Sequence, residues 1–161
     1  MGVNVIAEAT VQVLVEDTVD LFTPALKIDE IRAEVRDLRC HIIPGKVIFQ
    51  GVLHKQIFFV NEDNVVVHQG VDIPFSGFVE IAAAEPGQVC QLAAIIEFIE
   101  FELLSPTSLR EIAVIRVNVR LLDMLPFENV LITTPTNQTV FLGNRNSFVA
   151  RGKVTSTKKY V

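Results

Sequence analysis

Apolar and polar residues alternate with a period of two along most of the chain. Near the amino terminus, one side of this pattern consists of small and β-branched residues: Val5, Ala7, Ala9, Val11, Val13 and Val15. The intervening positions carry polar or charged residues: Glu8, Thr10, Gln12 and Glu16. Such alternation is typical of a strand with one buried and one exposed face. We therefore predict a half-buried strand over this first segment.

The second segment, residues 27–43, is compatible with two structures. Charged residues alternate with Ile31, Ala33 and Val35, which favours another long strand that ends at a Pro-Gly turn. Apolar residues also recur at helical spacing, at positions 28, 31, 35 and 38. A strand is the preferred interpretation, and a short helix over residues 27–38 remains the alternative.

Turn-forming residues divide the next part of the chain into two hairpins. Asn-Glu-Asp-Asn at 61–64 separates two β-rich runs and predicts the first hairpin. After a turn at 84–88, two long alternating segments are joined by Ser-Pro-Thr-Ser at 105–108, which predicts the second. In this second hairpin we expect Glu100 and Glu102 to lie on a polar face that meets Arg116 and Arg120 of the partner strand.

Shorter strands complete the pattern at 130–133, 139–142 and 148–154. The predicted fold class is all-β, an antiparallel β-sandwich with strand-like terminal extensions. We divide the chain into an amino-terminal strand or arm (1–16), which can be exchanged with a neighbour, a β domain (17–144) and a basic carboxyl-terminal strand or tail (145–161).

Composition agrees with a single domain that has apolar surface to spare. The chain has 161 residues, of which 50% are hydrophobic and 20% charged, and its mean hydropathy is +0.41. This is more apolar than a typical soluble domain, so part of the surface is expected to serve partners. No run approaches the roughly 20 apolar residues of a membrane helix, and the amino terminus lacks a basic start and an apolar block. We expect synthesis in the cytoplasm without a signal peptide, and no membrane insertion.

Charge is distributed unevenly between the two ends. Residues 1–37 hold eight acidic side chains and three basic ones. Residues 145–161 hold no acid and five basic residues: Arg145, Arg151, Lys153, Lys158 and Lys159. The net charge of −5 argues against a general nucleic-acid binder. Although Phe148 and Tyr160 lie among the basic residues, we interpret the tail as a surface for protein contacts.

The sequence contains no recognisable catalytic or metal-binding constellation. His41, His54 and His68 have no partner at the offsets that metal sites require. Ser76 lacks the elbow motif of a nucleophilic serine and is interpreted as a turn residue. Glu100 and Glu102 are interpreted as a solvated strand face rather than an acid/base pair. We predict no catalytic residue, no cofactor and no metal.

Cys40 and Cys90, the two cysteines of the chain, match no metal-binding spacing. Because cysteine is commonly buried, two free interior thiols are the preferred interpretation. A single disulfide is the alternative.

Several motifs follow one another after residue 44: KVIFQG (46–51), a hairpin containing FFV (58–60), IPFSGFVEI (73–81) and a Glu-Pro-Gly turn (85–87). In this combination residues 45–104 resemble the SPOCS domain, a family associated with spore-coat assembly in endospore-forming bacteria. The resemblance implies a structural signature, formed by Pro74, Phe75, Phe78, Pro86 and Gly87.

Within this signature, Pro74 suits an edge strand or a bend because it has no amide donor. We expect Phe75 and Phe78 to fill the core. The alternative is a hydrophobic groove on Phe75, Phe78 and Val79 that binds a peptide or ligand.

These features together favour a non-enzymatic structural protein that assembles into a spore-coat, envelope or filament polymer. Strand addition and complementary charged ends would join the copies. The expected interface residues are Val5, Val11, Val13, Val15, Arg151, Lys153, Lys158 and Lys159. We expect the protein to bind copies of itself and other coat or envelope proteins, and not nucleic acid. Its expected location is the spore coat or the cell or spore surface. The alternative is a non-polymeric module that tethers a coat protein, a peptide or a glycan.

Overall fold

The computed structural model describes residues 3–124 and 147–151, which form seven strands and no helix. The strands are β1 (Val3–Asp20), β2 (Ala25–Ile43), β3 (Lys46–Asn61), β4 (Val66–Glu80), β5 (Val89–Ser105), β6 (Ser108–Met124) and β7 (Ser147–Arg151). The strands predicted at 130–133 and 139–142 lie outside the described residues, as does the end of the one predicted at 148–154.

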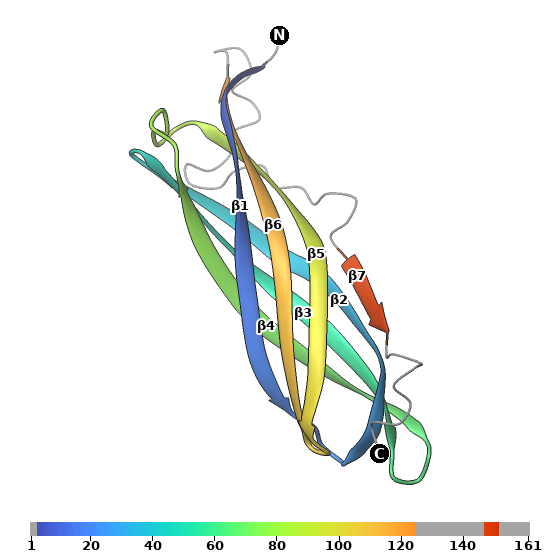
Figure 1. The fold of residues 1–161 in the computed structure, drawn as a ribbon. Helices are drawn as coiled ribbons and strands as arrows, with labels where there is room; N and C mark the ends of the chain where they lie inside the picture. Colours follow the sequence, from blue (N-terminus) through green and yellow to red (C-terminus); the bar gives the residue numbers. More distant parts are fainter. Residues whose placement is uncertain (1–2, 125–146, 152–161) are drawn as a thin grey trace.

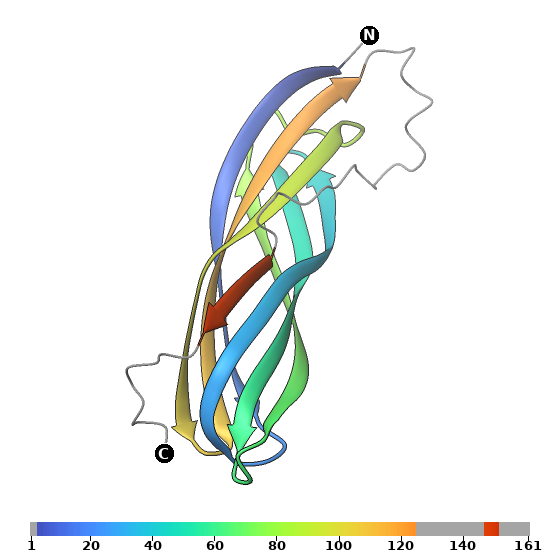
Figure 2. The same ribbon diagram turned by 90° about the vertical axis from the view of Figure 1, so that its right-hand side faces the viewer.

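The strands form two antiparallel sheets that pack face to face (Figures 1 and 2). One sheet has the order β1-β6-β5 and the other has the order β4-β3-β2-β7. Figure 2 shows β7 beside β2 at the margin of its sheet. The predicted all-β sandwich is confirmed, and its core lies between the two sheets.

β1 lies at an edge of its sheet and pairs with β6 of the same chain along its length. The register is continuous from Ala7 to Asp20 and is interrupted between Val5 and Ala7. Beyond this irregularity Val5 is 53% exposed, so its predicted place on the buried face is wrong. Val15 is buried, and Val11 and Val13 pack against the core as predicted.

β2 is a strand throughout, so the helical alternative is wrong. Its register against β3 shifts between Ile28 and Glu30 and again between Arg36 and Arg39, where Asp37 has a φ of 54°. At each shift, the next buried apolar side chain follows after three residues instead of two, so the alternation changes phase. As a result, the residues at 28, 31, 35 and 38 are all buried, which explains why the segment imitates helical spacing.

The FSGF segment of β4 completes the core beside β3. Phe75 pairs with Gly51, and Gly77 pairs with Phe49, so each phenylalanine faces a glycine on the neighbouring strand. A Cβ atom at Gly51 would lie 2.6 Å from Cζ of Phe75, and one at Gly77 would lie 2.7 Å from Cζ of Phe49. The two rings therefore occupy the space that the glycines leave free.

Phe78 does not belong to this core. Phe75 is 8% exposed, as predicted, but Phe78 is 54% exposed. The two positions are three residues apart, so in a strand their side chains point to opposite faces. The Nζ atom of Lys46 lies 5.8 Å from the centre of the Phe78 ring on the outer surface. The expectation that Phe78 fills the core is wrong.

The predicted turns lie where expected. In the β3–β4 turn, the side-chain oxygen of Asn61 accepts hydrogen bonds from the amides of Asp63 and Val65. Pro86 and Gly87 lie in the connection between β4 and β5, where Gly87 has a φ of 101° that favours glycine. Ser76 lies within β4 rather than in a turn. Pro74 also lies in β4, which is an edge strand as Pro74 suggested.

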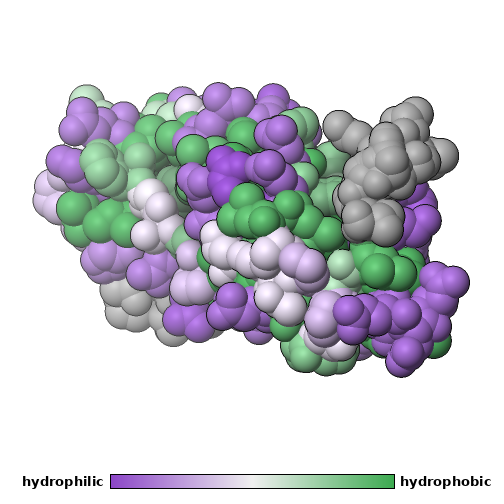
Figure 3. Space-filling view, turned by 60° about the horizontal axis from the view of Figure 1, so that its bottom comes forward, coloured by the Kyte–Doolittle hydropathy of each residue, from purple (hydrophilic) through white to green (hydrophobic). Residues whose placement is uncertain are grey.

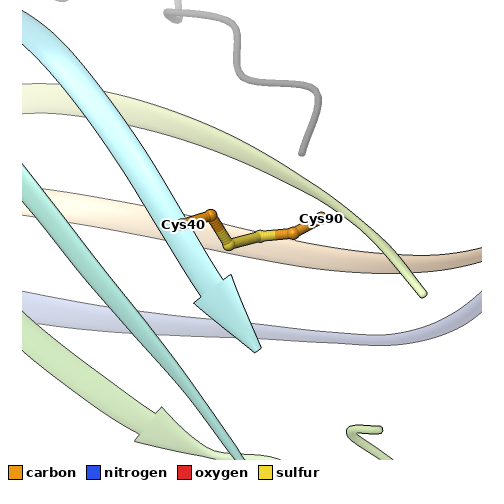
Figure 4. The surroundings of a disulfide bond; sticks show 2 residues. All are labelled: Cys40 and Cys90. Atoms are coloured by element: carbon orange, nitrogen blue, oxygen red, sulfur yellow. A yellow bond between two sulfur atoms is a disulfide. The ribbon is translucent and has the colours of Figure 1, made fainter. Parts of the chain in front are cut away.

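A disulfide bond joins Cys40 on β2 to Cys90 on β5 and so links the two sheets (Figure 4). Both residues are buried, and their Cα atoms are 6.6 Å apart. The preferred interpretation of two free thiols is wrong, and the disulfide alternative is confirmed. Burial was anticipated, but the sequence alone does not show that these two positions face each other across the core.

Candidate functional site

The residues predicted to form an assembly interface lie on two separate edge strands. Val5, Val11, Val13 and Val15 belong to β1, and Arg151 belongs to β7 on the other sheet. Lys153, Lys158 and Lys159 lie outside the described residues. The structure therefore brings the valines together along one sheet edge and places Arg151 apart from them.

The four edge strands differ in how open they are to another strand. β7 has five residues, and β4 contains Pro74, which lacks an amide donor. The β5 register against β6 is irregular at two places, between Ile96 and Phe98 and between Leu103 and Ser105. β1 has 18 residues, contains no proline or lysine, and keeps one register from Ala7 to Asp20. Of these edges, β1 offers the longest uninterrupted template for strand pairing.

The outer face beside β1 carries cross-strand charge pairs. Arg120 on β6 lies 3.2 Å from Glu8, and Arg110 lies 3.1 Å from Glu16. Arg110 also lies 3.6 Å from Glu102. The predicted contacts of Glu100 and Glu102 with Arg116 and Arg120 are wrong, because the register places Arg116 opposite Ile95 and Arg120 opposite Gln91. Arg116 meets Glu97 instead, at 3.4 Å. These exposed pairs neutralise the face but stabilise the fold little, by about 0–1 kcal/mol each.

Arg151 pairs with an acidic residue of its own chain. Its Nη1 atom donates a hydrogen bond of 2.7 Å to Oε1 of Glu30, which is largely buried on β2 and also pairs with Arg32. The attraction expected between the acidic amino-terminal part and the basic carboxyl-terminal part thus operates within the molecule at this residue. It helps to hold β7 beside β2.

Exposed apolar side chains gather at the end of the sandwich where β1, β3 and β5 end. They are Phe22, Val65, Val66 and Leu104. The amide of Leu21 donates to the carbonyl of Thr107 at 2.9 Å, which ties the β1–β2 connection to the β5–β6 turn. Figure 3 views the molecule toward this end and shows green apolar patches separated by purple polar side chains. The apolar excess of the composition is therefore partly displayed at the surface.

Three charged residues meet inside the sandwich. Lys55 of β3 and Glu111 of β6 are each 1% exposed, and Asp17 of β1 lies beside them. The Lys55 Nζ atom donates to Oδ1 of Asp17 at 2.6 Å and to Oε1 of Glu111. Asp17 and Glu111 are direct cross-strand partners, and Lys55 approaches them from the opposite sheet. We call these three residues the Lys55 centre.

The electrostatics of the Lys55 centre are unbalanced. Burial raises the pKa of Glu111, the Lys55 ammonium counteracts this shift, and the neighbouring charge of Asp17 adds to it. Two buried oxygens, Oδ2 of Asp17 and Oε2 of Glu111, have no hydrogen-bond partner among the residues that the structure describes. Buried polar atoms without partners are uncommon and are often associated with chemistry or strain.

Sequence reasoning missed the Lys55 centre, although the sequence carries a signal for it. In β3 the inward positions before and after Lys55 are occupied by Leu53 and Ile57. Glu111 stands in the same way between the buried Leu109 and Ala113. A charged residue that interrupts an apolar alternation is predicted to point inward, and it then needs a partner there.

Other sites offer less chemistry. Within residues 3–124 and 147–151, no three His, Cys, Asp or Glu side chains are grouped so that they could hold a metal. A pocket of about 550 Å³ lies beside the second irregularity of β2, lined by Asp37, Arg39, Gln50, Gly51, Val52, Pro74, Phe75 and Ser76. No helix in the described part of the chain is long and apolar enough to span a membrane.

Comparison with known proteins gives one family. A family model described as SipL, SPOCS domain, matches residues 24–104. Neither the curated proteins nor the solved structures contain a match to the chain. The matched range covers β2, β3, β4 and nearly all of β5, whereas β1 and β6 lie outside it. Lys55 is thus inside the matched range, and its partners Asp17 and Glu111 are contributed by the flanking strands.

Proposed function

The chain belongs to the SPOCS-domain family, which indicates a spore-associated protein, and from this premise we propose that it is a non-enzymatic structural subunit. In this proposal, copies of the chain assemble with one another, and with other coat or envelope proteins, into a polymer at the spore coat or surface. The family match begins at residue 24 and ends at residue 104, so it includes β2 as well as the motifs of residues 45–104.

The observation that carries the proposal is the edge position of β1, which among the described strands pairs with β6 alone. Along an edge strand, alternate backbone N–H and C=O groups have no partner within the sheet and can bind another strand. β1 also presents Leu14, which is 63% exposed, and Val5 on its surface. A neighbouring molecule that pairs with β1 would satisfy the backbone groups and cover these side chains.

The charge distribution supports contact between copies. The amino-terminal 37 residues hold eight acidic groups and three basic ones, and the last 17 residues hold five basic groups and no acidic one. Of these five, Arg151 pairs with Glu30 of its own chain. Complementary charge speeds encounter and selects orientation more than it adds affinity. A contact between unlike surfaces repeats without closing unless its rotation forms a ring, so a filament is the simplest product.

The disulfide is consistent with this location. Disulfides persist where thiols are oxidised, which includes extracellular proteins and cell surfaces, and are rare in a reducing cytoplasm. The Cys40–Cys90 bond joins the two sheets and would keep the subunit folded outside the cell. Its formation after synthesis fits a protein that ends on the spore exterior.

Matched edge variants test the role of β1. In one variant, Val5→Lys is combined with Leu14→Lys, which places two lysines on β1. In the control, Phe98→Lys is combined with Leu104→Lys on β5, which adds the same charge at two similarly exposed positions. Lysines protect sheet edges from pairing. Light scattering and electron microscopy should show that the β1 variant loses assembly and the β5 variant retains it; the reverse pattern would contradict the proposal.

The basic tail is tested separately. Lys158→Glu combined with Lys159→Glu should weaken assembly, and the deficit should depend on salt because surface charges are screened beyond about 10 Å at 0.1 M salt. Equal assembly of this variant and the wild type at low salt would exclude a role for the two lysines.

A second candidate function is a non-polymeric binding module, favoured by the exposed Phe78 ring under Lys46. Phe75 is buried and cannot contribute to such a surface. The ring could stack on an aromatic or glycan partner. This module would be favoured if the wild type stays monomeric and binds spore-coat extract, and if the Phe78→Ala variant loses that binding.

A further inference from the structure

We propose that Lys55 and Asp17 become joined by an amide bond between their side chains, with Glu111 as the catalytic residue that transfers the protons. The bond would form within one chain, without an added enzyme or cofactor. This inference depends on the geometry of the Lys55 centre and not on the proposed assembly.

The reacting groups already touch. Nζ of Lys55 is 2.6 Å from Oδ1 of Asp17, which is bonded to the carbon that the amine would attack. Glu111 contacts the same nitrogen from the strand beside Asp17. Lys55 and Glu111 are buried almost completely, so bulk water is kept from the centre. Reacting groups held in this way have effective molarities of about 10⁵–10⁸ M in favourable cases.

The reaction is a condensation that balances without an oxidant or reductant. The Lys55 ammonium gives a proton to the Glu111 carboxylate and becomes a neutral amine. Asp17, whose side chain is 14% exposed, takes up one proton from the solvent and reacts as the carboxylic acid. Nζ attacks Cγ of Asp17, and a C–N bond forms in a tetrahedral intermediate. Glu111 takes a proton from the nitrogen and supplies one to the departing hydroxyl. The C–O bond breaks, one water leaves, and the amide remains.

The buried environment favours these steps. An apolar interior makes buried charges costly, and the condensation replaces the amine and the carboxyl group by one neutral amide. The raised pKa of Glu111 suits a residue that must both hold and release a proton. In water the same amine and acid would remain a solvated ion pair, which does not react.

The product also accounts for the two oxygens without partners. One oxygen of Asp17 leaves as water, and the other becomes the amide carbonyl. Protonated Glu111 can donate from Oε2 to that carbonyl while its Oε1 accepts from the new amide N–H. Every polar atom of the centre is then paired, whereas before the reaction Oδ2 of Asp17 and Oε2 of Glu111 are not.

The bond would be a second covalent link between the sheets. It would join β1 to β3, while the disulfide joins β2 to β5. Cys40 is paired with Phe49, and Lys55 lies about 20 Å farther along β3 at the usual rise per residue. The two links would hold opposite halves of the sandwich, and the amide would resist reducing agents that open the disulfide.

Intact mass spectrometry of the purified, reduced and denatured full chain tests the proposal. The wild type should weigh one water less than its sequence, and a proteolytic map should yield a branched peptide that contains both Lys55 and Asp17. Lys55→Arg should have the full mass, because arginine remains protonated and cannot attack. Glu111→Gln should also keep the full mass, because the amide cannot transfer the protons.

Two further results keep the test decisive. Asp17→Asn can form the same amide by releasing ammonia, so it should reach the same final mass as the wild type, an outcome that a purely structural role of Asp17 does not predict. A folded wild type with the full mass and an unmodified Lys55 peptide would overturn the proposal. So would a loss of water that persists in Lys55→Arg, since the water would then come from another residue.

Discussion

Gly51 and Phe75 lie opposite each other on β3 and β4, and the Phe75 ring fills the space above the glycine. Two residues farther along, the two strands exchange roles: the glycine, Gly77, is on β4, and the phenylalanine opposite it, Phe49, is on β3. The IPFSGFVEI segment, which contains no catalytic group, therefore has a packing role on one face. Phe75 and Gly77 of this segment each form a pair with a residue of β3, Gly51 and Phe49 respectively.

The first prediction concerns these glycines. Gly51→Ala and Gly77→Ala should each destabilise the fold by about 1–3 kcal/mol, because the new methyl group would press against a buried ring. Gly70→Ala is the matched control on β4, since its Cβ would be 3.9 Å from the nearest atom. Urea unfolding should show a change within about 0.5 kcal/mol for the control. Equal effects at all three glycines would contradict the pairing.

The second prediction separates the two phenylalanines of the segment. Phe75→Ala should lower the free energy of unfolding by about 3–5 kcal/mol, the usual range for emptying a buried aromatic site. Phe78→Ala should change it by less than about 1 kcal/mol, because the ring is on the surface and interacts mainly with Lys46. Chemical denaturation of both variants measures the difference. A large loss for Phe78→Ala would mean that the ring is covered in solution.

The third prediction concerns the disulfide. The bond closes a loop with a sequence separation of 50, for which chain entropy gives about 4 kcal/mol of stabilisation. Cys40→Ala combined with Cys90→Ala should therefore unfold at a lower urea concentration, with a loss of about 2–4 kcal/mol. The wild type under reducing conditions should show a loss of similar size. A loss below about 1 kcal/mol in both experiments would show that the bond constrains the unfolded chain little.

The fourth prediction concerns pH. Burial raises the pKa of Glu111 above its ordinary value of 4.5, so the folded protein binds this proton more tightly than the unfolded chain. The resulting stabilisation is fully present below pH 4.5 and is lost as the pH rises through the folded-state pKa. If Lys55 is converted to an amide, the cation that lowers the pKa of Glu111 is lost. The pKa of Glu111 is then still raised, and stability still falls with rising pH.

Glu111→Gln lacks this titration. The stability of the wild type relative to the variant should decrease as the pH is raised from below 4.5 into the neutral range. Urea unfolding of both proteins at a series of pH values measures the trend. A wild type that gains stability over the variant with rising pH would show that Glu111 is held mainly as a carboxylate.

The sequence predicted the fold class and the hairpins because each turn carries its own local chemistry. It predicted less about which face a side chain occupies, because a single irregularity reverses the alternation. Val5 became exposed beyond one such irregularity, and two others gave β2 its helical spacing. Phe78 needed no irregularity: its odd distance from Phe75 already placed it outside.

The candidate sites depended on contacts between sheets, which local patterns do not specify. Cys40 and Cys90 lie on strands of different sheets, so their pairing follows from how the sheets stack. The Lys55 centre likewise needs three strands to converge. Each charged residue was visible as an interruption of an apolar face, but its partners were not.

Negative-stain electron microscopy of the purified full chain, at high concentration and moderate salt, shows whether the protein polymerises. An open β1 edge, apolar surface and complementary charged ends predict regular polymers, and a filament is the expected form. Light scattering on the same sample reports whether any polymer is a minor fraction. A protein that remains monomeric throughout, with no ordered assemblies on the grid, would contradict the account of this chain as a self-assembling structural subunit.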